Sequence, residues 1–422
     1  MRSAPLRVAV IGEAPVDPVE ASVVSPTDMI SLDLLYDGLT SWNVDTGTWQ
    51  PAIAESLSVS DDGLVWRVEL SDHTFSDGSA VTAVDVERSL ERLLADPNSV
   101  AAARLDAVAD IKVVDSAALE IVLAEPFALL PALLSSPVYG VVPDTALDGS
   151  VGSGPMPADL DDGVDDGVAV QLVSVADADA AVDAYRAGEV DLAFVPPSFD
   201  GEVDVSVTSA VESHYVFNVT AFDVVDPNVR RAIVQAIDPA RIAEVGYGPG
   251  AAPFQSAGAT EVAYPLGELS IAFVDDDGGA EAAMAAELAA QVDALGGSAV
   301  SAASDIESFV ALVGAGEHEL VRSGWIGLFP WPQGRLTSFA GDSPDNVTGY
   351  ANDAFDAALA EALATDDLTA YEAAAEILDD DGVLLPVATL NIRALVHSRV
   401  RGLDLRHDGT FDLAGMVLAE PG

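Results

Sequence analysis

The stretch that decides the fold is residues 35–94, which read LYDGLTSWNVDTGTWQPAIAESLSVSDDGLVWRVELSDHTFSDGSAVTAVDVERSLERLL. Asp-Gly pairs divide it into short elements, because Gly tolerates positive φ and Asp bonds its own backbone. The turn at 60–63 precedes the alternating segment 64–70, which predicts a β-hairpin. Thr82 and Asp85 predict a capping box at the start of an amphipathic helix. The stretch is therefore a scaffold signature and contains no catalytic arrangement.

The order and spacing of these signals resemble the peptide/nickel class of solute-binding proteins, which serve ABC importers. The shared features are a Y-x-G-L turn, a T-G-x-x-x-P turn, an S-D-D-G-L hairpin and a T-A-x-D-V-x-x-S helix start. Residues 213–246 are also similar to the strand that crosses between the lobes in this family and to the helices that follow it. The resemblance covers most of the chain and is weakest at 151–170 and at the loop 324–332.

This resemblance implies an α/β fold of the two-lobed periplasmic-binding-protein type (type II, cluster C-like) with a smaller inserted α+β domain. The residues themselves support an α/β lobe, since strand, helix and strand patterns between 268 and 322 predict a parallel βαβ unit. We predict three parts, named lobe I (1–35, 150–210 and 395–422), the inserted domain (36–149) and lobe II (211–394).

The composition excludes several classes of partner. The chain has 422 residues, of which 17 are basic and 70 acidic, giving a formal net charge of −53. Such a charge argues against nucleic acid and anionic membrane surfaces as partners. The acidic residues are spread over turns and helix starts, which favours solubility or adaptation to salt over a cation-gathering function.

The sequence contains no cysteine, so disulfides, thiolate chemistry and Cys-ligated metals are excluded. No apolar run approaches the roughly 18 residues of a membrane span. Residues 1–5 lead directly into a predicted strand at 6–11, with no apolar signal segment before it. The resemblance implies an extracytoplasmic, cell-surface or periplasmic protein, which would need an export signal upstream of Met1. A cytoplasmic protein on the same scaffold is the alternative.

Motifs for catalysis are missing. No histidines have the spacing of a metal site, and no G-x-S-x-G occurs. The G-S-G at 152–154 lacks the G-K-[ST] of a phosphate loop, and the acidic run at 159–167 lacks the spacing of a calcium loop. We therefore predict a protein that is not an enzyme and uses no cofactor or metal.

A solute-binding cleft needs apolar, partly aromatic walls with a few placed polar groups. Trp325, Phe329 and Trp331 are three large aromatic residues within seven positions of a chain that is 6% aromatic. Core packing and a cleft are equally compatible with each of them. The resemblance favours the cleft, because this loop borders the ligand in family members. By resemblance, the ligand-binding set also includes Tyr215, Asn218 and Tyr350.

One departure from the family concerns the ligand. In peptide-binding relatives an acid in this loop holds the amino terminus of the peptide, whereas residues 328–332 read L-F-P-W-P. An ammonium group buried without a carboxylate is strongly unfavourable. Either Glu13 or Asp17 replaces that acid, or the ligand is not a free peptide. Aromatic faces also suit sugars and flat apolar ligands, and no histidine cluster supports a nickel chelate.

Together these observations predict an extracytoplasmic solute-binding protein that delivers a peptide or other small organic solute to an ABC importer by cleft closure. The ABC permease is a partner by resemblance only, and the protein is expected to be a monomer. The alternatives are a binding or sensor module without a transporter and an oligosaccharide-binding member. The ligand itself is not predicted, because a fold does not define its ligand.

Overall fold

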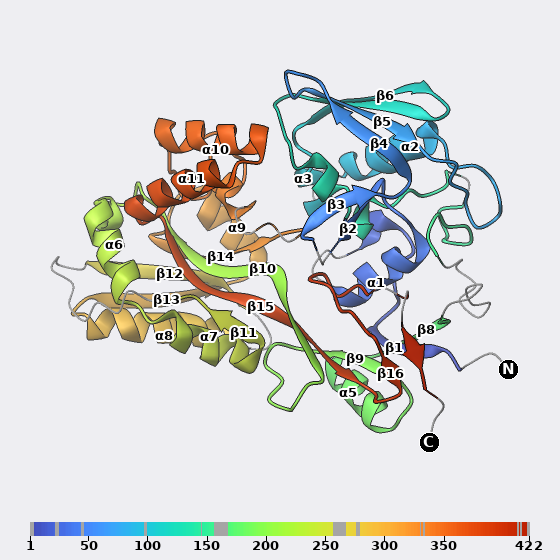
Figure 1. Cartoon of the computed structure of the whole chain (residues 1–422). Coiled ribbons are helices and arrows are strands. Elements are labelled where there is room, and N and C mark those ends of the chain that lie inside the picture. The colour runs from blue at the N-terminus through green and yellow to red at the C-terminus, as the bar shows by residue number, and fades with distance from the viewer. Residues whose placement is uncertain are drawn as a thin grey trace.

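The computed structural model describes residues 4–21, 25–43, 46–96, 99–144, 146–155, 168–255, 267–275, 279–329, 331, 334–411, 413 and 416–419. The acidic run at 159–167 lies outside these residues, as do Pro330 and Pro332 of the aromatic loop. Two lobes are joined by long strands, and the inserted domain stands above α1 (Pro26–Leu35) (Figure 1). Within the described part, no helix is long and apolar enough to cross a bilayer.

A single mixed sheet of nine strands runs through both lobes in the order β13-β12-β14-β10-β15-β9-β1-β8, with β11 paired to β15. It is parallel at both ends, where β1 pairs with β8 and β12 with β13, and antiparallel where β10 pairs with β14 and β15. The strands are β1 (Leu6–Ile11), β8 (Val170–Val175), β9 (Leu192–Val195), β10 (Val205–Phe217), β11 (Ala251–Pro253), β12 (Glu268–Val274), β13 (Ser298–Ser304), β14 (Leu320–Ile326) and β15 (Leu384–Val396).

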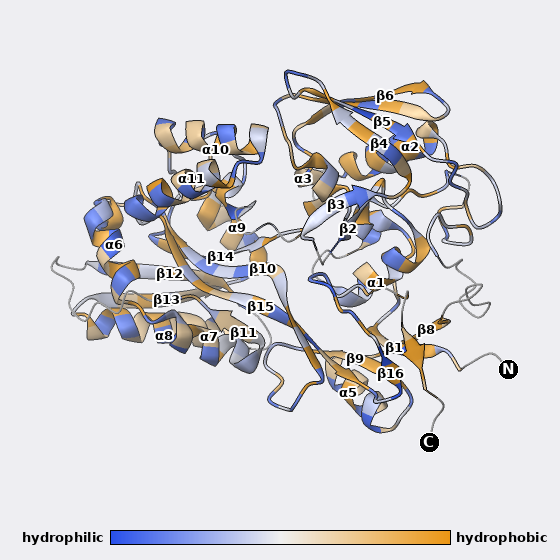
Figure 2. Cartoon of the chain, viewed as in Figure 1, coloured by the Kyte–Doolittle hydropathy of each residue, from blue (hydrophilic) through white to orange (hydrophobic). Residues whose placement is uncertain are grey.

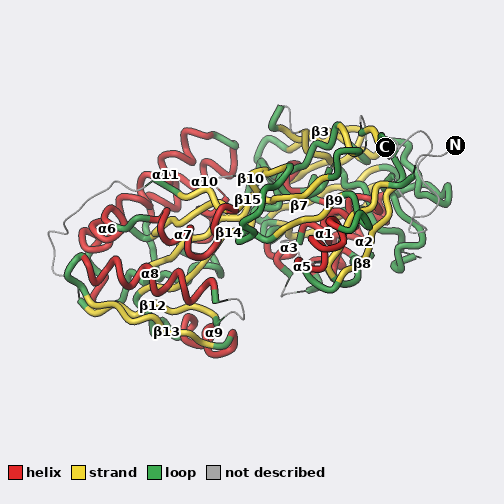
Figure 3. Tube along the Cα trace, turned by 90° about the horizontal axis from the view of Figure 1, so that it is seen from below, coloured by secondary structure: helices red, strands yellow, loops and turns green. Residues whose placement is uncertain are grey.

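The strands β10 and β15 connect the lobes. Each has 13 residues, and together they run through the narrow middle of the molecule (Figure 3). The residues between 387 and 394 pair with β10 and β11, so β15 is one continuous strand. The predicted lobe boundaries at 210 and 394 fall inside these strands, and the division into lobes stays a prediction.

Helices flank the sheet of lobe II on both sides. The predicted βαβ unit is confirmed, since β12 and β13 are parallel and α8 connects them. Along α8, Met284, Leu288 and Val292 recur at helical spacing and are fully buried. The exposed positions of this helix are mostly alanines, and Figure 2 shows hydrophobic and hydrophilic residues mixed along it. The helices of the lobes beyond α1 are α5 (Ala178–Arg186), α6 (Pro227–Ala236), α7 (Pro239–Tyr247), α8 (Ala280–Ala294), α9 (Ile306–Gly314), α10 (Asp353–Thr365) and α11 (Leu368–Asp381).

The inserted domain has its own four-stranded antiparallel sheet, in the order β4-β5-β7-β6. The predicted hairpin is confirmed, with Val59 opposite Trp66. The capping box is also confirmed, since the Thr82 N–H donates to the Asp85 carboxylate over 2.9 Å. The elements of this domain are β2 (Thr40–Asn43), β3 (Thr48–Pro51), β4 (Ala54–Val59), β5 (Val65–Leu70), α2 (Ala83–Leu94), α3 (Val100–Ala103), β6 (Val108–Asp115), β7 (Ala118–Leu123) and α4 (Leu130–Leu133).

The inserted domain packs directly on lobe II. The Ala128 N–H donates to the Leu363 carbonyl in α10 over 2.8 Å. Leu328 and Phe329 of lobe II lie in the same apolar cluster as Leu133 of the inserted domain. Pro137–Tyr139 form the 3-10 helix η2, and Val138 and Tyr139 are buried in the same cluster. These contacts place the inserted domain against the aromatic loop that follows β14.

Candidate functional site

A cavity of about 260 Å³ lies between the inserted domain and lobe II. Lobe II contributes Trp325 from β14, and Phe329 and Trp331 from the loop after it. Phe127 of the inserted domain lies on the facing wall. The charged residues that line the cavity are Arg104, Asp106, Glu125, Asp342 and Asp345. We call it the aromatic cavity.

The aromatic rings of this cavity contact one another across the two parts of the molecule. Phe329 and Trp331 are stacked with their ring centroids 5.6 Å apart and an interplanar angle of 5°. Trp331 is also 6.2 Å from Phe127 of the inserted domain and 5.8 Å from Tyr371 of α11, where the contact is edge-to-face. These are the separations that aromatic pairs prefer. Trp331 therefore bridges the inserted domain and lobe II.

Arg104 forms a second bridge. Its Cζ lies 3.7 Å from the ring centroid of Trp325, and its Nη1 is 3.4 Å from the Asp345 carboxylate. Burial lowers the pKa of Arg104, and the nearby Asp345 opposes this effect. A guanidinium over an indole face is attracted by the quadrupole of the ring. The arginine of the inserted domain is thus held by an indole and a carboxylate of lobe II.

Two further carboxylates of the cavity, those of Glu125 and Asp106, have raised pKa values. Burial raises the pKa of Glu125, and the charges of Asp106 and Asp342 raise it further. Burial is also the main cause that raises the pKa of Asp106, against the opposing effects of a backbone hydrogen bond and of Arg104. Like charges near one another disfavour the ionised form. Several acidic side chains thus line the cavity beside its aromatic wall.

A larger cavity of about 520 Å³ lies on the other side of the same loop, and Gly327 and Leu328 line both cavities. Its remaining walls include residues 209–211 of β10 and 390–393 of β15. Arg393 is buried there and donates to the carbonyls of the 197–199 segment. This second cavity therefore lies mainly along the crossing strands and lobe I, and the inserted domain contributes Ser136 to its lining.

The structure brings together three of the eight predicted ligand-binding residues, namely Trp325, Phe329 and Trp331. Glu13 is exposed and lines a separate cavity of about 230 Å³ at the end of β1. The Asp17 carboxylate accepts from the Val19 N–H over 3.1 Å and forms an ion pair with Arg92. Neither acid lies beside the aromatic loop, so the structure provides no support for the replacement predicted for the missing acid.

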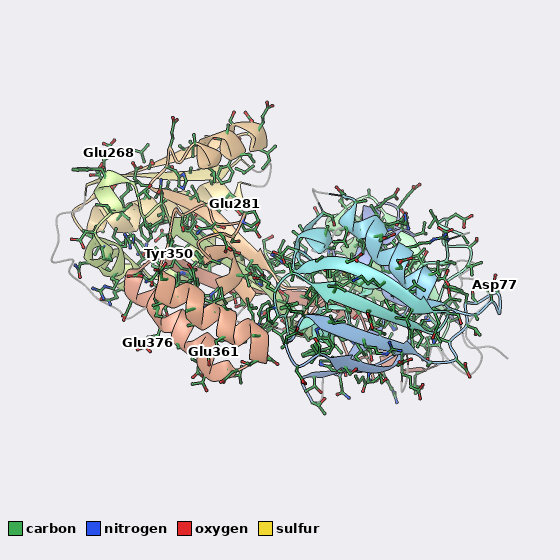
Figure 4. All side chains as sticks on the ribbon, turned by 90° about the horizontal axis from the view of Figure 1, so that it is seen from above. Asp77, Glu268, Glu281, Tyr350, Glu361 and Glu376 are labelled. Atoms are coloured by element: carbon green, nitrogen blue, oxygen red, sulfur yellow. The ribbon has the colours of Figure 1, made fainter. Side chains whose placement is uncertain are left out.

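The other three predicted residues have structural contacts inside lobe II. Tyr215 is fully buried in the core around β10. The Asn218 side chain donates to the Gly316 carbonyl over 2.9 Å. The Tyr350 hydroxyl donates to the Asp381 carboxylate over 2.7 Å, and Figure 4 places Tyr350 within lobe II, away from the inserted domain. Their assignment to ligand binding stays a prediction.

The sequence did not predict the cavity residues that come from the inserted domain, most importantly Arg104, Glu125 and Phe127. The only local signal was the Glu-Pro-Phe segment at 125–127, which reads as a turn after a strand. Among the described residues, no group of three or more His, Cys, Asp or Glu could hold a metal ion.

This architecture is that of the two-lobed solute-binding proteins. HbpA2 from Haemophilus parasuis has a TM-score of 0.81 at 18% identity, covering 98% of this chain and 99% of that one. The unliganded open form of MppA, a periplasmic murein tripeptide binding protein, has a TM-score of 0.79 at 19% identity, covering 98% and 97%. The predicted α/β fold class is confirmed.

Within that class, residues 48–157 match the family described as bacterial extracellular solute-binding proteins, family 5 middle. The glutathione-binding protein GsiB of Shigella flexneri is 24% identical over 246 residues, which cover 50% of this chain and 48% of the relative. The chain thus spans about half the length of the curated relatives it matches. The resemblance to the peptide/nickel class of solute-binding proteins is confirmed.

Proposed function

We propose that this protein binds a small organic solute in the aromatic cavity and presents it to an ABC importer, and that it is a binding protein rather than an enzyme. The cavity itself carries the proposal, because Phe329, Trp331 and Phe127 meet there from two parts of the molecule. Aromatic walls with a few placed polar groups are typical of small-molecule sites. The similarity to binding proteins named for a tripeptide and for glutathione supports a solute of that size.

Closure is the proposed mechanism. A solute in the aromatic cavity, against Phe127 and Trp331, would contact the inserted domain and lobe II at the same time and so add to the contacts that already join them. Such a solute favours the closed state by the difference in its affinity for the two states. We propose that the closed form acts outside the cytoplasmic membrane as a monomer and docks on a membrane permease, in line with the extracellular family that residues 48–157 match.

Thermal unfolding tests the binding claim. A solute that binds only the folded state raises the melting temperature. We expect a rise with a pool of short peptides or a pool of oligosaccharides, tested separately. Trp331→Ala should weaken binding of the active solute about tenfold, because it removes the central ring of the cavity. The matched control is Phe222→Ala, since Phe222 is an aromatic residue that is 89% exposed and lines none of the cavities described above.

The outcomes separate the alternatives. A rise with oligosaccharides alone identifies an oligosaccharide-binding member. A solute that binds the purified protein but does not promote its association with a permease indicates a binding or sensor module without a transporter. No rise with either pool in a well-folded protein contradicts a peptide or oligosaccharide ligand. Equal affinities for the wild type and Trp331→Ala contradict the aromatic cavity as the site.

A further inference from the structure

The charged groups around the aromatic cavity indicate the class of solute, an inference that rests on the function proposed above. We propose that the solute is an organic cation whose ammonium or guanidinium group lies among Asp106, Glu125 and Asp342. Its apolar body would lie against Phe127 and Trp331. The inserted domain would then supply much of the ligand recognition.

The charges that line the cavity do not balance. Four carboxylates face a single cationic side chain, Arg104, which already pairs with Asp345 and covers Trp325. Asp106, Glu125 and Asp342 have no ion pair with a basic group among the described residues. Acidic residues are common in this chain, and many, such as Glu361 and Glu376, lie on the outer surface (Figure 4). Asp106, Glu125 and Asp342 are also exposed, but all three line the rim of one ligand-sized cavity.

The three carboxylates also act on one another. The pKa of Glu125 is raised first by burial and then by the nearby charges of Asp106 and Asp342. A positive group between them would offset this repulsion and replace part of the lost hydration. An anionic group in the same position would add to the repulsion. The electrostatics of the cavity therefore favour a cation over an anion.

The aromatic wall provides independent evidence. Trp325 is only 3% exposed, lines the cavity, and its indole N–H has no acceptor among the described residues. A buried donor without an acceptor is unfavourable, so an oxygen of a bound solute would stabilise it. The same ring already holds the Arg104 guanidinium at 3.7 Å, which shows that the wall accommodates a planar cation. The geometry thus suits a cationic solute that also carries a hydrogen-bond acceptor.

Three probes with the same phenyl ring test the sign of the charge. Benzylamine is cationic at neutral pH, benzyl alcohol is neutral and benzoate is anionic. Their dissociation constants are measured by titration calorimetry at one low ionic strength, because salt screens the charge effect. We expect benzylamine to bind several-fold more tightly than benzyl alcohol, and benzoate to bind most weakly. Benzylamine that fails to bind, or binds no better than benzoate, overturns the inference.

A matched pair of variants locates the effect. Glu125→Gln should weaken benzylamine about threefold and leave benzyl alcohol unchanged, because it removes one exposed rim charge. Glu55→Gln removes the same charge from an exposed position on β4 of the inserted domain and should change neither probe. If both variants lose the same affinity for benzylamine, the effect comes from the overall charge of the protein, and Glu125 is not part of the binding site. If these tests fail while Trp331→Ala still weakens the active pool solute, only the cation class is wrong and the proposed function stands.

Discussion

Replacing Asp191 by asparagine tests how the two chain ends are tied into lobe I. Asp191 is 0% exposed. Its carboxylate accepts from the Arg7 Nε and Nη2 over 2.9 Å each and from the Arg399 Nε over 2.7 Å. Arg7 lies in β1 and Arg399 near the carboxyl end of the chain. The buried carboxylate therefore joins three distant segments.

The size of the effect follows from burial. Removing one partner of a buried ion pair costs about 3–5 kcal/mol, since the other charge is left uncompensated. Arg399 is 8% exposed and loses its carboxylate, whereas the Arg7 side chain is 32% exposed and retains contact with water. We therefore expect Asp191→Asn to lower the free energy of unfolding by about 3 kcal/mol, near the lower limit.

The pKa of Asp191 determines the pH range over which its carboxylate stabilises the fold. Burial alone would raise the pKa of Asp191, but the hydrogen bonds from Arg399 and Arg7 outweigh it and hold the pKa far below its usual range. A carboxylate with a depressed folded pKa stabilises the fold fully above its unfolded pKa of about 4 and loses this contribution only as the pH falls through the folded value. The difference between wild type and variant should therefore be equal at neutral and mildly acidic pH.

Urea unfolding followed by circular dichroism measures this difference. Glu189→Gln is the control, because Glu189 is an exposed acid two positions away, and it should change the stability by less than about 0.5 kcal/mol. If Asp191→Asn lowers the free energy of unfolding by less than about 1 kcal/mol, the value typical of an exposed ion pair, the Asp191 carboxylate does not act as a buried partner of Arg399.

Three further predictions concern local features. Thr82→Ala removes the N-cap of α2 and should cost about 1 kcal/mol in thermal unfolding, and no change would contradict the capping box. Burial, with Arg322 and Arg335, lowers the pKa of His214 to about 3, so the unfolded chain binds a proton first as the pH falls below about 6.5. The wild type should therefore lose about 2 kcal/mol of its free energy of unfolding between neutral pH and about pH 5, and His214→Phe should not show this loss. Equal pH profiles of the two proteins would refute a neutral buried imidazole. Gly152→Ala would place a Cβ 2.1 Å from the Leu35 carbonyl oxygen, so we expect a clearly lower melting temperature, whereas a neutral effect would contradict that packing.

The local elements could be predicted because their causes are local. The hairpin at 60–63 needs only its turn residues and the alternation of its strands, and the capping box needs only Thr82 and Asp85. The continuity of β15 has a different cause. Residues between 387 and 394 become strand because β10 and β11 pair with them from far along the chain.

The sequence predicted only the part of the candidate site whose residues are close together in the chain. Trp325, Phe329 and Trp331 are neighbours in sequence, so their density was visible. Arg104 and Glu125 reach the cavity only through the packing of the inserted domain on lobe II, and one more acidic residue carries no signal in a chain with 70 of them. Arg104 is more noticeable in the sequence, because the chain has only 17 basic residues. Its partner Trp325, however, could be identified only from the structure.

Amide hydrogen exchange shows directly whether the solute binds in the aromatic cavity. It is measured with and without the peptide or oligosaccharide pool that raises the melting temperature. We expect slower exchange at 103–107 and 125–133 of the inserted domain together with 325–345 of lobe II, since residues of these segments line the aromatic cavity. Protection confined to 194–197, 209–211 and 390–393 would place the solute in the larger cavity at the crossing strands and would exclude the aromatic cavity as its binding site.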